Sequence, residues 1–328
     1  MKIIEVITDA SDSEILISIA EQYEITDYWV DLERDKQRCA VRMLVNDDKR
    51  QQVMDALQEV IATNENSRIL VIPVEAALSN EQEEEAEKKK IVPASVTREE
   101  LYKGIELNSR LDNTFLLLVT LSTIVVSIGL LQDNVAVVIA AMVIAPLLGP
   151  NLALAFSTSL GDTDLLLQSL KTLMAGLGLA LVLSVIIGFL WPHGFDSNEV
   201  TARTEVGMDS IALALASGAA AVISLTTGLS GVLVGVMVAI ALLPPTAVLG
   251  ITLGAGHYDL AAGAGLLLAV NIVCLNLASK LVFLVKGVKP RTWLEQRKAH
   301  QSNVVYIIFW LVSLIILMVA IYLRQHIA

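Results

Sequence analysis

The stretches AVVIAAMVIAPLLGPNLALAFSTSLGDTDL (136–165) and GVLVGVMVAIALLPPTAVLGITLGAGHYDL (231–260) decide the fold, because they align without a gap at an offset of 95 residues. Aligned valines and leucines can reflect shared hydrophobicity alone, whereas aligned prolines, glycines and aspartates require a closer relationship. Such identities occur at Pro150 and Pro245, at Gly161 and Gly256, and at Asp164 and Asp259. The sequence therefore predicts an internal duplication.

Long apolar runs surround and include the two aligned stretches. The chain of 328 residues is 55% hydrophobic and only 17% charged, whereas about a quarter of the residues in soluble domains are charged. Runs close to the ~20 residues that a bilayer requires fall at 114–131, 134–160, 165–191, 208–226, 230–256, 260–286 and 303–323. We therefore expect an α-helical polytopic membrane protein with about seven spans.

The offset of 95 residues also maps the first span onto the fourth and the third span onto the sixth. Each repeat unit then holds three helices, so the two consecutive units must enter the membrane from opposite sides. We expect a 3+3 inverted repeat with broken helices, as in many secondary transporters, and one extra span at the end.

The N-terminal region has a different pattern. KIIEVIT (2–8) reads as a strand, a helical pattern follows, and residues 28–45 alternate as in a hairpin before a second amphipathic helix and a last strand at 67–75. The order β-α-β-β-α-β predicts an α+β ferredoxin-like domain. Such a domain is typical of metabolite-sensing or oligomerising modules, so we expect a homo-oligomer.

The predicted organisation is a ferredoxin-like domain at 1–78, a charged linker and amphipathic interfacial helix at 79–112, membrane repeats at 113–191 and 207–287, a basic cytoplasmic loop at 288–302, and a seventh span with the tail at 303–328. We expect no cleaved signal peptide in the N-terminal residues. The segment 286–300 has five Lys or Arg residues and the segment 191–206 has one. The positive-inside rule then predicts a cytoplasmic N-terminus, an external C-terminus and insertion in the plasma (inner) membrane.

Charge and residue inventory exclude several classes of function. The net charge of -11 comes largely from acids between Glu5 and Glu100, so the chain offers no basic surface for nucleic acid. Cys39 and Cys274 fall in different compartments, and we expect no disulfide between them. No HExxH, GxSxG or Walker pattern occurs, so we expect no enzymatic activity, metal site or cofactor.

The prolines of the duplicated stretches mark the predicted site. A proline removes a backbone donor and crowds the carbonyl four residues earlier, so both helices should break near the middle of the membrane. Free backbone groups at that depth are tolerated only where protein or a water-filled cavity satisfies them. Half-helices that begin at Pro150 and Pro245 would aim amide groups at an anion or a dipolar solute. The alternative is a proline kink that only shapes packing.

Polar residues within the spans complete the set of candidates. Ser122 and Ser217 are paired by the repeat, and Asn271 lies in the sixth span. Interhelical hydrogen bonding is the alternative role for all three. The candidate substrate-binding residues are Pro146, Gly149, Pro150, Asn151, Pro244, Pro245, Thr246, Ser122, Ser217 and Asn271.

The charged residues of the spans lie near their ends. No Asp, Glu or His falls at the middle of a span, which disfavours a carboxylate proton relay. Asp162, Asp164 and Asp259 are expected to cap helices. Lys171 and Lys280 are expected to extend toward the membrane surface.

The stretches DNVAVVIAAMVIAPLLGPNLALAF (133–156) and SGVLVGVMVAIALLPPTAVLGI (230–251) resemble the paired signatures of an uncharacterised prokaryotic membrane family. It is family 389 among the domains of unknown function, also called the uncharacterised hydrophobic domain family. The resemblance covers residues 110–290, and the N-terminal domain is similar to that of longer members. No activity is implied by this resemblance.

Two functions compete on the sequence alone. The first is a transporter or channel for a small anion or polar solute, in which the cytoplasmic domain regulates or assembles the membrane part. The alternative is a membrane-anchored metabolite sensor or scaffold without transport activity. The expected partners are the lipid bilayer, the solute and further copies of the chain.

Overall fold

The computed structural model describes residues 2–32, 38–46, 49–61, 67–74, 97–191, 197–227, 231–288 and 293–327. In the segments 231–241 and 293–304 it describes the backbone alone. The chain divides into two compact units, Met1–Arg98 and Glu99–Ala328. The predicted charged linker from residue 79 to residue 96 lies outside the described residues, as do residues 289–292 of the predicted basic loop.

In its described residues, the first unit is a four-stranded antiparallel sheet with two α-helices. Its elements are β1 (Lys2–Asp9), the short 3-10 helix η1 (Ala10–Asp12), α1 (Ser13–Gln22), β2 (Tyr28–Leu32), β3 (Arg38–Val45), α2 (Arg50–Ile61) and β4 (Arg68–Pro73). The strand order is β2-β3-β1-β4 and every pairing is antiparallel. The βαββαβ order predicted from the sequence is present.

Alternation along the central strands builds the core of this unit. Ile4 and Val6 of β1 and Val41 and Met43 of β3 are fully buried and lie on the same face of the sheet. Side chains of a strand alternate between its two faces, so one face can be apolar throughout. Leu16 of α1 and Val53 and Leu57 of α2 belong to the same buried cluster, which means that the two helices cover this face.

The second unit is helical. Its elements are α3 (Arg98–Asn108), α4 (Asn113–Leu131), α5 (Val135–Ile144), α6 (Leu148–Leu160), α7 (Thr163–Leu190), α8 (Asn198–Thr201), α9 (Met208–Thr226), α10 (Gly231–Gly254), α11 (Tyr258–Val285) and α12 (Trp293–Ile327). Among the described residues, α4, α7, α9, α11 and residues Val305–His326 of α12 are long and apolar enough to cross a membrane. The bent pair of α5 and α6 adds a sixth candidate. This unit is the membrane part of a membrane protein.

The break between α5 and α6 bends the chain by 55°. Ala145 has φ -70° and ψ 118°, an extended conformation, as expected for a residue that precedes a proline. Pro150, in contrast, is the third residue of α6, a position in the first turn whose amide has no partner within the helix. The break is therefore set by Pro146, four residues before the position predicted for the start of the half-helix.

The second predicted break is wrong. α10 runs from Gly231 to Gly254 with Pro244 and Pro245 inside it. The offset of the repeat explains the difference, because the position equivalent to Pro146 is Ala241. Alanine keeps its amide and does not push the preceding residue out of the helical region, so the chain passes through this point as a helix.

A close contact joins α7 and α10. Small residues on α7 face small residues on α10. On α7 these are Ser184 and Gly188, and on α10 they are Gly250 and Gly254, so the two residues on each helix are four positions apart. A Cβ on Gly188 would lie 2.7 Å from the carbonyl carbon of Ile251, and one on Gly254 would lie 2.9 Å from the nitrogen of Phe189. Small residues at this spacing let two membrane helices approach to backbone contact.

α3 packs on the membrane unit through its apolar face, with Leu101 and Ile105 buried. The hydroxyl of Tyr102 donates to Asp162 Oδ2 at 2.8 Å. Burial and this hydrogen bond raise the pKa of Tyr102 to about 12. Asp162 also accepts from the backbone amides of Asp164 and Leu165, so its predicted role as a helix cap is confirmed.

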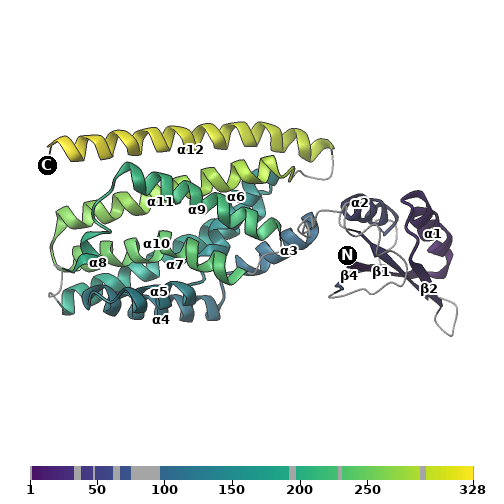
Figure 1. Cartoon of the computed structure of the whole chain (residues 1–328), viewed down its shortest axis with the longest axis horizontal. Helices are drawn as coiled ribbons and strands as arrows, with labels where there is room; N and C mark the ends of the chain where they lie inside the picture. The colour runs from purple at the N-terminus through teal and green to yellow at the C-terminus, as the bar shows by residue number, and fades with distance from the viewer. Residues whose placement is uncertain are drawn as a thin grey trace, which may run out of the picture. The chain divides into compact units, whose positions relative to one another are not determined.

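The long helix α12 lies along the outside of the bundle, and its C-terminal end is at the same end of the bundle as α8 (Figure 1). Gln325 Nε2 donates to the carbonyl of Val206 at 3.2 Å, and Arg324 donates to the carbonyl of Asp259 at 3.0 Å. α12 begins at Trp293, ten residues before the predicted start of the seventh span.

Candidate functional site

A cavity of about 440 Å³ opens between α8, α9, α10 and α11. Its lining combines ionised, polar and apolar side chains. The lining residues are Glu199, Ala202, Arg203, Asp209, Ser210, Leu213, Ala214, Ser217, Pro245, Leu267 and Asn271.

The cavity reaches the middle of the spans. Ser217 is nine residues from either end of α9, and Asn271 is at the midpoint of α11. Asp209, at the start of α9, lines the same cavity. The eight residues from Asp209 to Ser217 correspond to about 12 Å along the helix axis. The cavity therefore connects the end of α9 with the depth at which a membrane helix normally meets only lipid or protein.

The short helix α8 and the turn that follows it hold two charged residues at the end of the cavity, Glu199 and Arg203. Arg203 forms an ion pair with Glu199 at 2.7 Å and also donates to the carbonyl of Glu199 at 2.7 Å. Both side chains are largely buried. An ion pair with a second hydrogen bond and little solvent has a fixed geometry, so these two charges stay at the cavity.

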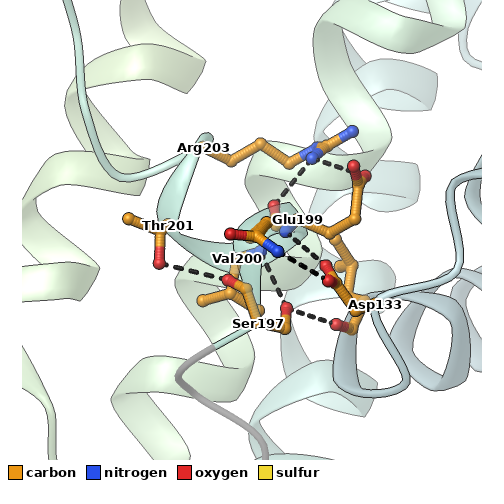
Figure 2. A network of polar contacts seen from close by, with 8 residues as sticks. Asp133, Ser197, Glu199, Val200, Thr201 and Arg203 are labelled. Atoms are coloured by element: carbon orange, nitrogen blue, oxygen red, sulfur yellow. Dashed lines mark hydrogen bonds and ion pairs between the residues drawn. The ribbon is translucent and has the colours of Figure 1, made fainter.

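Asp133, in the turn between α4 and α5, anchors α8 (Figure 2). One carboxylate oxygen accepts from the backbone amide of Glu199 at 2.9 Å, and the other accepts from the side-chain amide of Asn198 at 2.8 Å. Ser197 donates from its hydroxyl to the carbonyl of Leu130 at 2.7 Å. The backbone hydrogen bond from Glu199 and then the side-chain hydrogen bond from Asn198 lower the pKa of Asp133 below its usual value.

The structure brings three of the sequence-predicted residues together at this cavity, namely Ser217, Pro245 and Asn271. Thr246, next to Pro245, is buried and donates to the carbonyl of Leu242 at 2.7 Å. Ser122, the repeat partner of Ser217, is fully buried and donates to the carbonyl of Val119 at 3.1 Å. The two repeat-related serines thus have different environments.

Pro146, Gly149, Pro150 and Asn151 lie together at the start of α6, whereas Pro244 lies in α10. Pro146 lies in the break and Pro150 in the first turn of α6. A Cβ on Gly149 would lie 2.8 Å from the carbonyl carbon of Asn108, so this glycine permits the close approach of α3. Pro244 is buried inside α10 next to Pro245.

Asn151 belongs to a polar contact between α6 and α11. Its Oδ1 accepts from Asn276 Nδ2 at 2.8 Å, and both side chains are fully buried. One turn further along α11, Lys280 is also fully buried and donates to the carbonyl of Thr158 at 3.3 Å. The expectation that Lys280 extends to the membrane surface is wrong, because α6 and α12 cover it. Lys171, the other lysine of that prediction, is exposed.

The sequence prediction did not include the residues of segment 191–206 among the cavity residues. Glu199 and Arg203 lie in a short polar segment between apolar runs, and such a segment gives no periodic signal that would place these residues over a span. Their spacing of four residues is the one signal that could have paired them on a helix. The Ser184–Gly188 and Gly250–Gly254 pairs were also missed, although the small-residue spacing of four is readable in the sequence.

These observations define a polytopic helical membrane protein with a cavity of mixed polar and apolar lining that reaches mid-span. A family model described as Domain of unknown function (DUF389) matches residues 142–277. An uncharacterized protein of Methanocaldococcus jannaschii is 34% identical over 294 residues, which are 89% of this chain and 90% of that protein. No solved structure matches the chain. The chain belongs to the DUF389 family, as the paired proline-containing stretches indicated.

Proposed function

We propose that the protein moves a small polar or anionic solute across the membrane, as a transporter or channel, through the cavity lined by Ser217, Pro245 and Asn271. The observation that carries this proposal is the depth of the cavity, which extends from charged residues at one end of α9 to the midpoints of α9 and α11. Polar space at that depth costs free energy in a membrane protein unless water or a solute fills it.

The charges at the cavity favour a polar solute over a simple anion. Arg203 is paired with Glu199, and Asp209 adds a further acid to the lining. The lining therefore has more negative than positive groups, which opposes the entry of an anion and permits a solute with hydrogen-bonding groups or a positive end.

A 3+3 inverted repeat within a bundle of seven spans is part of the proposal. Two helix contacts support it, because the residues of one contact are the repeat equivalents of the residues of the other at the offset of 95. Ile251 of α10 lies against Gly188 of α7, and the equivalent residues Phe156 of α6 and Phe283 of α11 have ring centroids 5.2 Å apart. The second helix of each repeat thus packs on the third helix of the other repeat, as a two-fold relation requires.

The orientation proposed for the membrane protein has α8 outside the cell and the first unit in the cytoplasm of a plasma (inner) membrane. The basic residues of segment 286–300 support it through the positive-inside rule. In this orientation the cavity faces the exterior. We further propose that the first unit assembles or regulates the membrane part in a homo-oligomer.

Solute flux into proteoliposomes tests the proposal. The purified full chain is reconstituted, and uptake of small neutral, zwitterionic and anionic solutes is followed by the change in light scattering after an osmotic step. Ser217→Leu fills the cavity at mid-span, and its matched control is Ala216→Leu, which adds the same side chain on the exposed side of α9.

We expect uptake of at least one solute to exceed that of empty liposomes, to fall about tenfold or more in Ser217→Leu, and to stay unchanged in Ala216→Leu. Uptake equal to that of empty liposomes across the panel would contradict transport and would favour a sensor or scaffold. Equal uptake by the two variants would contradict passage through this cavity.

A further inference from the structure

The cavity lies within the second repeat, and the first repeat has equivalent positions. At the offset of 95 residues, Ser210 of α9 and Asn271 of α11 correspond to Phe115 of α4 and Gly176 of α7. Ser210 and Asn271 both line the cavity, so the cavity borders both helices. The equivalent pair shows whether α4 and α7 enclose a similar space.

The ring of Phe115 fills the equivalent space in the first repeat. A Cβ on Gly176 would lie 2.9 Å from Cζ of this ring and 2.9 Å from Cδ2 of Leu147, so the ring lies directly against the backbone of α7. Phe115 is 5% exposed and belongs to a buried apolar cluster of the membrane unit. The two positions that border the cavity in the second repeat are therefore in contact in the first.

Helix α3 is the repeat equivalent of the segment that contains α8, and it packs more closely. The offset pairs Arg203, which lines the cavity, with Asn108 at the end of α3, and it pairs Pro244 with Gly149. A Cβ on Gly149 would lie 2.8 Å from the carbonyl carbon of Asn108. Proline has a Cβ and a ring, so the backbone of Arg203 cannot approach Pro244 in the same way. A glycine in one repeat and a proline in the other thus allow α3 alone to make this contact.

Hydroxyl side chains lie deeper in the first repeat than Phe115. Ser122 is seven residues, or two turns, beyond Phe115 on the same face of α4. Ser122 and Thr172 of α7 are fully buried, and they are the equivalents of Ser217 and Leu267, which line the cavity. Both hydroxyls donate to backbone carbonyls of their own helices, at 3.1 and 3.0 Å. Water or a solute can therefore reach their oxygen lone pairs without breaking a hydrogen bond between helices.

We propose that Phe115, together with the contact of α3 at Gly149, is the cytoplasmic gate of the solute pathway, and that Ser122 and Thr172 line the half of the pathway that this gate closes. The inference rests on the proposed transport and orientation, in which α4 begins at the cytoplasmic side. The cavity is the external half. When the ring leaves Gly176, the first repeat takes the open arrangement of the second. The structure is then open to the exterior and closed to the cytoplasm, one of the two states of a transporter built from inverted repeats.

The reactivity of a cysteine at position 122 tests the gate. The full chain with Cys39→Ala, Cys274→Ala and Ser122→Cys is placed in inside-out membrane vesicles, which present its cytoplasmic face to an added trimethylammonium methanethiosulfonate. Each rate is divided by the rate of the same thiol in the chain unfolded in SDS. The rate is measured with native Phe115, with Phe115→Ser, which introduces the residue type of the second repeat, and with Leu117→Ser. Leu117 is the matched control because it lies on the exposed face of α4.

A second chain separates local opening from a loss of the fold. It combines Cys39→Ala with Phe115→Ser and keeps Cys274, which is fully buried, as its single thiol. Cys274 should stay as slow to react as it is with native Phe115. If Phe115→Ser exposes Cys274, Gly149→Ala takes its place, because the new Cβ pushes α3 away and leaves Phe115 unchanged.

We expect Phe115→Ser to raise the rate of Ser122→Cys about tenfold or more, and Leu117→Ser to leave it unchanged. Gly149→Ala should raise the same rate about threefold or more. With native Phe115, Ser122→Cys should still react about threefold faster than Cys274, because a gate opens part of the time.

Two results would overturn the proposal. One is a rate for Ser122→Cys that Phe115→Ser, or Gly149→Ala in its place, leaves unchanged while Cys274 stays buried. The other is a Ser122→Cys that reacts as slowly as Cys274 when Phe115 is present, since the ring would then be a fixed part of the packing. These rates do not measure flux, so a failed gate with intact uptake and an opening gate without uptake are distinguishable.

Discussion

The close contact between α7 and α10 gives the sharpest test of the packing. In Gly188→Ala the new Cβ lies 2.7 Å from both the carbonyl carbon and the Cα of Ile251. Carbon atoms pack at about 3.5–4.0 Å, so the two helices must separate by roughly 1 Å. Overpacking of this kind costs about 1–3 kcal/mol. The higher helix propensity of alanine offsets about 0.5–1 kcal/mol of that cost.

Gly178→Ala is the matched control because it lies on the same helix and nothing lies within 4 Å of its added Cβ. It keeps the propensity gain and avoids the clash. The difference between the two variants isolates the clash at about 1–3 kcal/mol, or roughly 2–10 °C in the midpoint of unfolding. We expect Gly188→Ala to unfold below the wild-type chain and Gly178→Ala to unfold at or above it.

The buried thiol of Cys274 supplies the assay. The chain has two cysteines, so Cys39→Ala leaves Cys274 alone, and Cys274 is fully buried among α9, α11 and α12. A thiol-reactive fluorophore then reports the opening of the membrane unit on heating. Equal midpoints for Gly188→Ala and Gly178→Ala would refute the backbone contact between α7 and α10.

Three further substitutions test other parts of the structure. Tyr102→Phe removes the hydrogen bond to Asp162 and should destabilise the membrane unit by about 0.5–1.5 kcal/mol, measured by the same thiol assay; an unchanged midpoint would contradict the contact. Asp133 has a pKa lowered below its usual 3.8, so its anchoring of α8 is complete above pH 3.8 and is lost as pH falls through the lower value in the folded state. Hydrogen exchange at residues 198–201, corrected for intrinsic rates, should therefore accelerate on acidification in the wild-type chain, and Asp133→Asn should exchange fast at neutral pH as well; slow exchange in Asp133→Asn would count against the anchor. Pro146→Ala should let α5 and α6 join, which would lengthen the distance between spin labels at residues 135 and 160 by about 4 Å; an unchanged distance would mean that packing and not Pro146 holds the bend.

The elements of both units could be predicted from the sequence because their patterns are local. Alternation and helical spacing gave the βαββαβ order, and apolar runs gave α4 and α9 to within a residue. The position of the bend was harder, since both Pro146 and Pro150 remove a donor. The difference depends on where α6 begins. Pro150 falls in the first turn of α6, where a backbone amide has no partner within the helix, so Pro146 sets the bend.

The candidate site could be predicted only in part. Ser217 and Asn271 were recognisable as polar residues in the middle of apolar runs, and both line the cavity. The burial of Lys280 was not predictable, because its position near the end of an apolar run is that of a lysine that reaches the surface. Its burial results from α6 and α12, which are far from it in sequence, and no local pattern reports such packing.

The claim that water and solute reach the middle of the spans is tested most directly by the reactivity of single cysteines in intact proteoliposomes. In a background without native cysteines, Ser217→Cys is compared with Ser122→Cys, its buried repeat partner, and with Gly178→Cys on an exposed face of α7. A charged, membrane-impermeant thiol reagent should modify Ser217→Cys at least tenfold faster than either of the other two. Modification of Ser217→Cys as slow as that of Gly178→Cys would show that lipid or protein fills this place, and it would contradict the proposed pathway.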